Sequence, residues 1–346
     1  MDLAVIIPAL NEAEALPLLL GDLRRQSGVA LQIIVVDGGS SDSTVSIAEA
    51  QGCLVIHSAA GRARQMNAGR AATDCPLLLF LHADSRLPDT GQLAKALARY
   101  RARARPNTAA HFPLRFIRQQ PGHEALFNYL EARTRTQLPY TVNGDQGLLI
   151  QAEFFDRLGG YDESLPFLED LRIAKAVEAQ GQWLLLPGEM RSSARRFESE
   201  GHLQRYLLMG LIVTLHEARA WQFFDDARAL YTSQDQTRAL EMGPWFALAR
   251  RALAAGGPLA WCRRMWRCGR LTRDNYWQLL LRPEVLREPD PAQHPTARFL
   301  RWHSRLRHAT RNPLAVLICS LIAINMIYSR RMWRRGIAHF GALPEA

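Results

Sequence analysis

The feature that most constrains the fold is a short, uninterrupted apolar run followed closely by an acid. Residues 77–81 are Leu-Leu-Leu-Phe-Leu, and Asp84 comes three residues later. Such a run is typical of a strand that is buried on both faces of a parallel sheet. Ligands of open α/β sheets bind at the carboxyl ends of such strands, where an acid can hold a divalent metal or contact a ligand. The alternative is a solvated acid that only ends the strand.

Strand patterns and helix patterns alternate along the first part of the chain. Strands are expected at residues 3–7, 31–36 and 54–57 and again at 77–84, with short loops and helical segments between them. This alternation predicts a doubly wound α/β sheet. We expect Pro8 to end the first strand and Asn11 to cap the helix that follows. No G-x-G-x-x-G follows the first strand, which counts against a dinucleotide-binding domain.

A second strand also ends in an acid, Asp37, and a glycine-rich turn follows it at residues 38–44. Glycines at the start of a helix suit a phosphate or a ribose, because free N–H groups and the helix dipole face the ligand. The turn alone is a weak signal, and both acids could simply cap loops. Two acids at the ends of two separate buried strands favour a ligand site.

Several motifs, in order, resemble those of family 2 glycosyltransferases of the GT-A fold. Their residues are most similar to those of the branch associated with radical-SAM/selenodomain proteins. The motifs lie at residues 6–12 (Ile-Ile-Pro-Ala-Leu-Asn-Glu), 35–42 (Val-Val-Asp-Gly-Gly-Ser-Ser-Asp), 61–69, 79–84, 143–147 (Asn-Gly-Asp-Gln-Gly), 158–161, 168–170 and 193–197. The resemblance covers about residues 1–220. It implies a GT-A mixed sheet and an enzyme that takes a nucleotide-diphosphate sugar, a UDP-sugar above all, as its donor.

The resemblance also implies roles for individual residues. Asp170 matches the general base, and Asp145 is expected near the acceptor. Asp84 matches the last acid of the D-x-D motif, which binds a divalent metal. The expected nucleotide-sugar contacts are Pro8, Asn11, Glu12, Asp37, Arg62, Gln65, Asn67, His82, Ala83, Arg195 and Arg196. Asp170 could instead be an N-terminal acid of a helix at residues 171–179, and Arg195 and Arg196 could be a solvated pair.

The chemistry needs these residue types independently of the family. A hard cation, Mn²⁺ or Mg²⁺, prefers oxygen ligands and shares them with phosphates, so one carboxylate with diphosphate and water suffices. A carboxylate must take the proton of the acceptor hydroxyl, and direct displacement with one base inverts the anomeric centre. His82 stands where the family commonly has the first acid of D-x-D. Imidazole suits Mn²⁺ better than Mg²⁺, although His82 could also be structural.

Charge divides the chain into two parts. Residues 231–346 hold 19 Lys or Arg and 7 Asp or Glu, whereas residues 1–230 hold 24 and 26. We therefore expect a GT-A domain at 1–220 and a basic helical region rich in Trp and Arg at 221–346, which would meet an anionic surface. The five cysteines show no metal-ligand spacing, and free thiols are expected. The N-terminal residues look like a strand rather than a signal peptide, so we expect a cytoplasmic catalytic face.

An apolar run at residues 313–328 has arginines on both sides: Arg305, Arg307 and Arg311 before it, and Arg330, Arg331, Arg334 and Arg335 after it. The run is shorter than the roughly 20 residues that cross a bilayer. We expect peripheral contact with an anionic membrane at its inner face, which is compatible with a lipid-linked acceptor. A buried helix with a solvated basic face is the alternative. Two rival functions remain, a nucleotide-sugar-binding protein without catalysis and a nucleic-acid-binding protein, although the tail has no recognisable nucleic-acid module.

Overall fold

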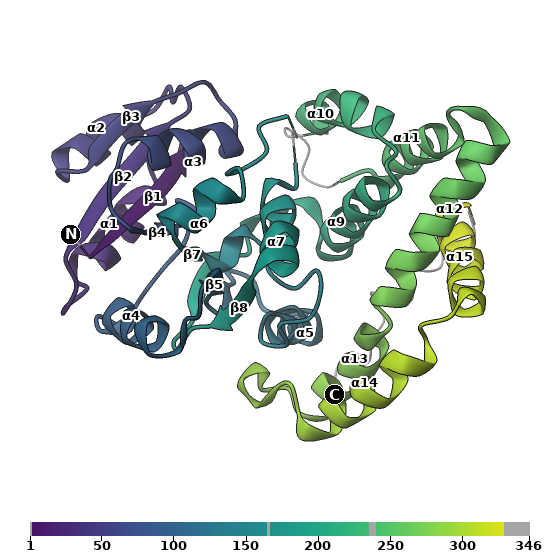
Figure 1. Ribbon diagram of the computed structural model, residues 1–346. Helices are drawn as coiled ribbons and strands as arrows, with labels where there is room; N and C mark the ends of the chain where they lie inside the picture. Colours follow the sequence, from purple (N-terminus) through teal and green to yellow (C-terminus); the bar gives the residue numbers. More distant parts are fainter. Residues whose placement is uncertain (1, 165–166, 235–239, 329–346) are drawn as a thin grey trace. The chain divides into compact units, whose positions relative to one another are not determined.

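The computed structural model describes residues 2–164, 167–234 and 240–328, which form two compact units (Figure 1). The first unit consists of Met1–Arg118, Leu126–Ser193 and Asp290–His294. The second consists of Gln119–Ala125, Ala194–Pro289 and Pro295–Ala346. Each unit is built around its own set of packed elements.

A mixed sheet in the order β3-β2-β1-β4-β7-β5-β8 is the centre of the first unit. Its strands are β1 (Leu3–Ala9), β2 (Leu31–Asp37), β3 (Leu54–His57), β4 (Leu77–Phe80), β5 (Thr108–His111), β7 (Leu148–Gln151) and β8 (Gln182–Leu185). β7 runs antiparallel to β4 and β5, while the other neighbouring strands pair in parallel. A small second sheet pairs β6 (Leu114–Ile117) with β9 (Met190–Ser193). The predicted doubly wound, mixed α/β sheet is confirmed.

Helices cover both faces of the large sheet, as the alternating pattern predicts. One apolar core lies between the sheet and α1 (Leu16–Arg24), α2 (Thr44–Ala50) and α4 (Gln92–Arg103). A second core lies between the other face and α3 (Arg62–Ala71), α6 (Ala152–Arg157) and α7 (Glu169–Gln180). α5 (Glu124–Thr134) and the short helix η1 (Gly144–Gln146) complete the segment between β6 and β7. The sheet is thus buried on both faces, which explains its unbroken apolar strands.

Two local expectations near the N-terminus are wrong. Pro8 lies inside β1 instead of ending it, because at Pro8 the strand is paired only with β2, and the missing N–H removes no bond to β4. Asn11 does not cap α1, which begins four residues after the expected start and has Ala15 at its N-cap. Asn11 instead adopts a left-handed conformation, with φ of 54°.

The second unit is helical. Its helices are α8 (Arg195–Glu200), α9 (His202–Glu217), α10 (Gln222–Gln234), α11 (Met242–Ala254), α12 (Gly257–Asp274), α13 (Trp277–Arg287), α14 (Ala297–Ala309) and α15 (Pro313–Tyr328). The chain passes from the first unit into this helical unit between Ser193 and Ala194, where α8 packs on α9 and α9 packs on α11 and α12. The domain bounds of 1–220 and 221–346 stay a prediction. The short helix η2 (Pro291–Gln293) falls in the first unit.

None of the five cysteines, all of which are among the described residues, forms a disulfide bond. Within the described residues, no single helix is both long and apolar enough to cross a membrane. α14 and α15 satisfy the length and composition criteria only as a pair, and they are bent by 106° at the break between them. The arginines predicted to follow α15 lie outside the described residues.

The close contact between α3 and the sheet yields a stability prediction. A Cβ on Gly69 of α3 would clash with the side chain of Ile6 and would lie 3.0 Å from Cγ2 of Val36. We expect Gly69→Ala to lower the free energy of unfolding by about 1–3 kcal/mol, measured by urea denaturation. Gly21→Ala in α1 is the matched control, because nothing lies within 4 Å of the added Cβ. The control should leave the free energy of unfolding unchanged or raise it by up to about 1 kcal/mol. An equal loss of free energy of unfolding in both variants would contradict the close packing of Gly69.

Candidate active site

The carboxylate of Asp37 ends β2 and organises the turn that follows it. Asp37 is 3% exposed, and its oxygens accept hydrogen bonds from the backbone N–H groups of Gly39 at 2.9 Å and Ser40 at 3.2 Å. Burial acts to raise the pKa of Asp37, but the donors of Ser40 and Gly39 outweigh it and hold that pKa below its ordinary value. Asp37 is therefore ionised and fixed in place.

The loop after β1 lies against this turn. The backbone N–H of Asn11 donates to Oγ of Ser40 at 2.9 Å, and Oδ1 of Asn11 accepts from the N–H of Ser41 at 2.9 Å. The N–H of Glu12 donates to Oγ1 of Thr44 at 2.8 Å. The structure thus brings the predicted donor residues Asn11 and Glu12 to the turn that begins at Asp37, while the half-buried Pro8 pairs with β2.

Gln65 on α3 supports the turn from inside the protein. Its Nε2 donates at 2.8 Å to two backbone carbonyls, those of Ala9 at the end of β1 and Val36 near the end of β2. The side chain is 4% exposed and lies against Gly38. The amide nitrogen is thus used to tie two strand ends together, so Gln65 positions Asp37. Direct contact between Gln65 and a donor stays a prediction.

Asn67 packs against backbone where a ligand was expected. Its Nδ2 donates to the carbonyl of Tyr161 at 2.9 Å and to Oε1 of Glu163 at 2.8 Å, and its Oδ1 accepts from the N–H of Tyr161 at 2.9 Å. Gly160 has φ of 67°, and a Cβ there would lie 2.9 Å from Oδ1 of Asn67. Asn67 therefore fixes the turn that precedes α7, and a contact with the donor stays a prediction.

Arg62 begins α3 and pairs with the first residue of α7. Its NH1 lies 2.9 Å from Oε1 of Glu169, whose side chain is 7% exposed, whereas that of Arg62 is 44% exposed. Desolvation acts against the charge of Arg62, but the negative charges of Glu169, Asp170 and Asp145 together raise its pKa. Arg62 thus lies beside three acids, which compete with a donor diphosphate for its charge.

The antiparallel pairing of β7 brings a second pair of side chains together, His82 and Asp145. Phe80 at the end of β4 is paired with Leu148 at the start of β7, so η1 lies at the same edge as the residues after β4. Nδ1 of His82 lies 2.9 Å from Oδ1 of Asp145, with the two side chains 15% and 39% exposed. A Cβ on Gly144 would lie 2.6 Å from Nε2 of His82. Only glycine therefore lets the imidazole lie against η1.

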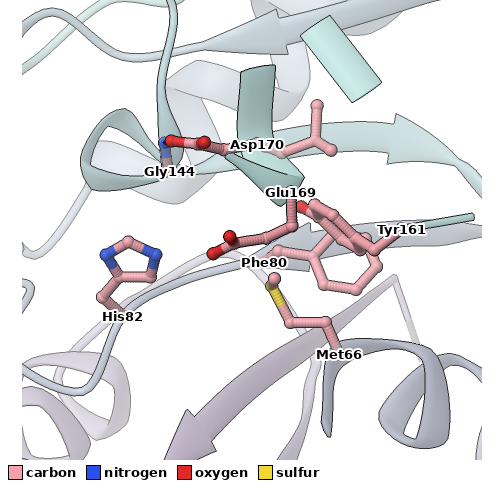
Figure 2. Close-up of a pocket in the computed structure, with 8 residues that line it drawn as sticks. Met66, Phe80, His82, Gly144, Tyr161, Glu169 and Asp170 are labelled. Carbon is pink, nitrogen blue, oxygen red and sulfur yellow. The ribbon is translucent and has the colours of Figure 1, made fainter. Parts of the chain in front are cut away.

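Asp170 lies across the same small pocket. The pocket is lined by Met66, Phe80, His82, Gly144, Leu148, Tyr161, Glu169 and Asp170 (Figure 2). Oδ2 of Asp170 accepts a hydrogen bond from the N–H of Gly144 at 2.9 Å. Burial, followed by the charge of neighbouring Glu169, raises the pKa of Asp170. A carboxylate with a raised pKa accepts a proton more readily, which suits a general base.

Ala83 and Asp84 form the turn after His82. Ala83 is buried, and Asp84 is half-buried without a hydrogen bond or ion pair to any other described residue, so both of its oxygens can accept a ligand. Within the described chain, no group of three or more His, Cys, Asp or Glu side chains could hold a metal ion. A single carboxylate can serve a hard cation only as one ligand among several, the others coming from groups such as diphosphate and water.

Two predicted site residues, Arg195 and Arg196, lie outside the first unit. Arg195 and Arg196 are the first residues of α8 in the second unit, and their contact with a diphosphate stays a prediction. Sequence reasoning missed Glu169 and Tyr161 as pocket residues. Glu169 lies in the motif at residues 168–170 but was given no role of its own, and its partner Arg62 is 107 positions away. Tyr161 lies in the motif at residues 158–161, but no role was assigned to its side chain.

Comparison with known proteins finds similarity to glycosyltransferases over part of the chain. Residues 4–150 match the family model "Glycosyl transferase family 2". A "PGL/p-HBAD biosynthesis glycosyltransferase" of Mycobacterium bovis (strain BCG / Pasteur 1173P2) is 36% identical over 102 residues, which are 28% of this chain and 40% of the relative. An uncharacterized glycosyltransferase of Mycobacterium tuberculosis (strain ATCC 25618 / H37Rv) is 30% identical over 117 residues, 32% of this chain and 51% of the relative. The chain thus spans about half or less of these relatives' length.

Solved structures with a similar course of the chain are distant. TarS of S. aureus in complex with UDP has a TM-score of 0.46 and 14% identity, and the match covers 85% of this chain and 89% of TarS. A mannosyltransferase of Pyrobaculum calidifontis in complex with GDP-Man and Mn²⁺ has a TM-score of 0.46 and 16% identity, over 95% of this chain and 88% of its own. At these TM-scores the likeness carries no argument about this chain.

The hydrogen bonds of Asp37 make its contribution to stability depend on pH. Because the pKa of Asp37 is lowered in the folded protein, its stabilising contribution is present above the unfolded pKa of about 3.9 and is lost as the pH falls through the folded pKa. We expect Asp37→Asn to lower the free energy of unfolding by about 1–3 kcal/mol at neutral pH.

The difference from the parent chain should shrink as the pH falls below about 4, as measured by urea denaturation at a series of pH values. Asp84→Asn is the control, because Asp84 makes no hydrogen bond with another described residue. A pH-independent loss in the Asp37 variant would argue against the hydrogen-bonded carboxylate.

Proposed function

We propose that this chain is an inverting family 2 glycosyltransferase that transfers a sugar from a nucleotide-diphosphate sugar, a UDP-sugar, to an acceptor hydroxyl. The observation that carries the proposal is the position of two carboxylates at one edge of the sheet. Asp37 ends β2 among the N–H donors of its turn, and Asp170 lies in the pocket beside His82 with a hydrogen bond from Gly144. Asp37 has a lowered pKa and stays ionised, and Asp170 has a raised pKa and readily accepts a proton. The family match over residues 4–150 supports the same reaction.

The donor nucleotide binds at the Asp37 turn. Asp37 accepts a hydrogen bond from the base, and Pro8, Asn11 and Glu12 line the same side. Within the family, the residues of the motifs favour the branch associated with radical-SAM/selenodomain proteins.

Asp84 holds a divalent cation, Mn²⁺ or Mg²⁺. When bound, the cation neutralises charge on the leaving diphosphate. The unpaired oxygens of Asp84 support this role. His82 beside it favours Mn²⁺, since imidazole is a poor ligand for Mg²⁺. Arg195 and Arg196 add fixed positive charge for the diphosphate, as the motif resemblance implies.

The transfer is a single displacement. The acceptor oxygen attacks the anomeric carbon, the bond from that carbon to the diphosphate breaks, and the acceptor proton passes to Asp170. One attack from the face opposite the leaving group inverts the anomeric centre. Asp145 acts on the acceptor side, where it also fixes the ring of His82.

A protein that binds the donor without catalysis is the rival function. The raised pKa of Asp170 argues against it, because a binding site has no need of a poised base. A donor-hydrolysis assay with the purified chain separates the two, since a binding protein releases no sugar from a UDP-sugar.

Calorimetry with UDP tests the donor side. We expect Asp37→Ala to weaken UDP binding with or without metal, because it removes the base contact. Asp84→Ala should keep metal-free UDP binding but abolish the tightening by Mn²⁺. Unchanged metal dependence in the Asp84 variant would remove that residue from the site.

Asp170→Asn tests the base. The change keeps the size of the side chain but removes the proton acceptor, so we expect transfer to fall by about 10²–10⁴-fold with donor affinity nearly intact. Asp156→Asn is the control, because Asp156 pairs with Arg70 at the surface and its side chain is 50% exposed. A variant at position 170 with full activity would exclude the role.

The pH profile adds a second readout for the same residue. Because the pKa of Asp170 is raised, activity should fall as the pH drops through that raised value. Glu169→Gln removes a neighbouring negative charge and should move this acid limb to lower pH. Arg62→Met removes a positive charge and should move it to higher pH. Shifts in the same direction would contradict the charge arrangement.

A further inference from the structure

α15 presents apolar side chains on two sides of the helix. One side is buried in the second unit and consists of Val316, Ser320, Ala323 and Ile327. The other side is between 41% and 64% exposed and consists of Leu314, Leu317, Ile318, Leu321, Ile322 and Met326. Steps of three and four residues place these six on one stripe, which we call the α15 stripe. A continuous exposed stripe of this kind marks an interaction surface.

The orientation of the α15 stripe is fixed by α12. A Cβ on Gly269 of α12 would clash with Oγ of Ser320 and lie 2.6 Å from the carbonyl oxygen of Val316, so the two helices are in close contact there. Near the end of α15, Nε1 of Trp261 donates to the hydroxyl of Tyr328 at 2.9 Å. Figure 1 shows α12 and α15 side by side. The stripe therefore cannot turn inward without breaking both contacts.

Positive charge flanks the stripe. Residues 291–328 contain five arginines and no Asp, Glu or Lys. Arg301, Trp302 and Arg305 are exposed on α14, and the guanidinium of Arg305 lies 5.8 Å from the centre of the Trp302 ring. Arg311 is exposed at the break between α14 and α15. Apolar side chains beside Arg and Trp match the chemistry of the interface of an anionic bilayer.

We propose that the α15 stripe and the exposed arginines of α14 form a docking surface for an anionic lipid bilayer, with the helix lying in the interface. Charge complementarity selects a bilayer over a second copy of this chain, whose matching surface would carry the same arginines. Docking rather than spanning follows from the buried side of α15, because a helix that crossed the bilayer would lose its contact with α12. The proposal does not depend on the transfer reaction.

The test is flotation of the full chain with vesicles of phosphatidylcholine, with or without phosphatidylglycerol. Leu314→Asn/Leu321→Asn removes two exposed leucines of the stripe that are 64% and 59% exposed. Leu279→Asn/Leu286→Asn is the matched control, with the same spacing on α13 and exposures of 78% and 53%. Arg301→Gln/Arg305→Gln removes charge from α14. Its control, Arg99→Gln/Arg103→Gln, changes an exposed pair with the same spacing on α4.

The parent chain should float with anionic vesicles and be released by high salt. The stripe variant should partition at least about tenfold less, and the α14 variant about fivefold less for each arginine removed. Both controls should stay within about twofold of the parent, since we expect no bilayer contact at their positions. Circular dichroism and gel filtration show whether each variant is folded and whether its oligomeric state has changed.

Three results would overturn the proposal. An equal loss of flotation with anionic vesicles in the α13 and α15 variants would show that the stripe is not the docking surface. Flotation of none of the chains, with a change of oligomeric state in the stripe variant, would make the stripe a contact between copies. Resistance of the parent chain to carbonate extraction would show that it spans the bilayer.

Discussion

The antiparallel pairing of β7 with β4 is the constraint on which the candidate site depends. A parallel strand at this place would start at the opposite edge of the sheet. Because β7 runs the other way, the residues just before it meet the residues just after β4, and Asp145 reaches His82. The N–H of Gly144 then meets Asp170 at the start of α7. One strand direction thus joins three segments that are far apart in sequence.

The acids at this edge of the sheet differ in their surroundings. Asp37 is surrounded by N–H donors, which stabilise its charge. Asp170 has one such donor from Gly144 but lies beside a second buried carboxylate, Glu169, which opposes its charge. Arg62 offsets part of that repulsion through its ion pair with Glu169. The division of roles between nucleotide contact and base therefore comes from the neighbours of each carboxylate, since the side chains are chemically the same.

Sequence reasoning recovered what depends on local pattern. The strand that ends in Asp37 and the helix at residues 313–328 follow from unbroken apolar runs and their flanking residues. The strand expected at residues 77–84 is present but ends at Phe80, four residues early. Sequence reasoning did not recover what depends on contacts across the chain. The hydrogen bonds from the side-chain amides of Gln65 and Asn67 to distant backbone groups could not be seen in their own motif. Pro8 was taken as a strand end because the sequence around it does not show that β1 at this position is paired with β2 alone.

The contact between α12 and α15 has a consequence for truncated forms of the chain. α15 covers a face of α12 that includes Gly269, with Met265, Cys268 and Leu271 also buried on α12. A protein cut before residue 313 would expose apolar surface that is normally inside the second unit. Such a fragment would be prone to self-association. A loss of vesicle binding in this fragment could therefore come from the damaged core as well as from the missing helix. Point substitutions on the outer side of α15 leave that core intact.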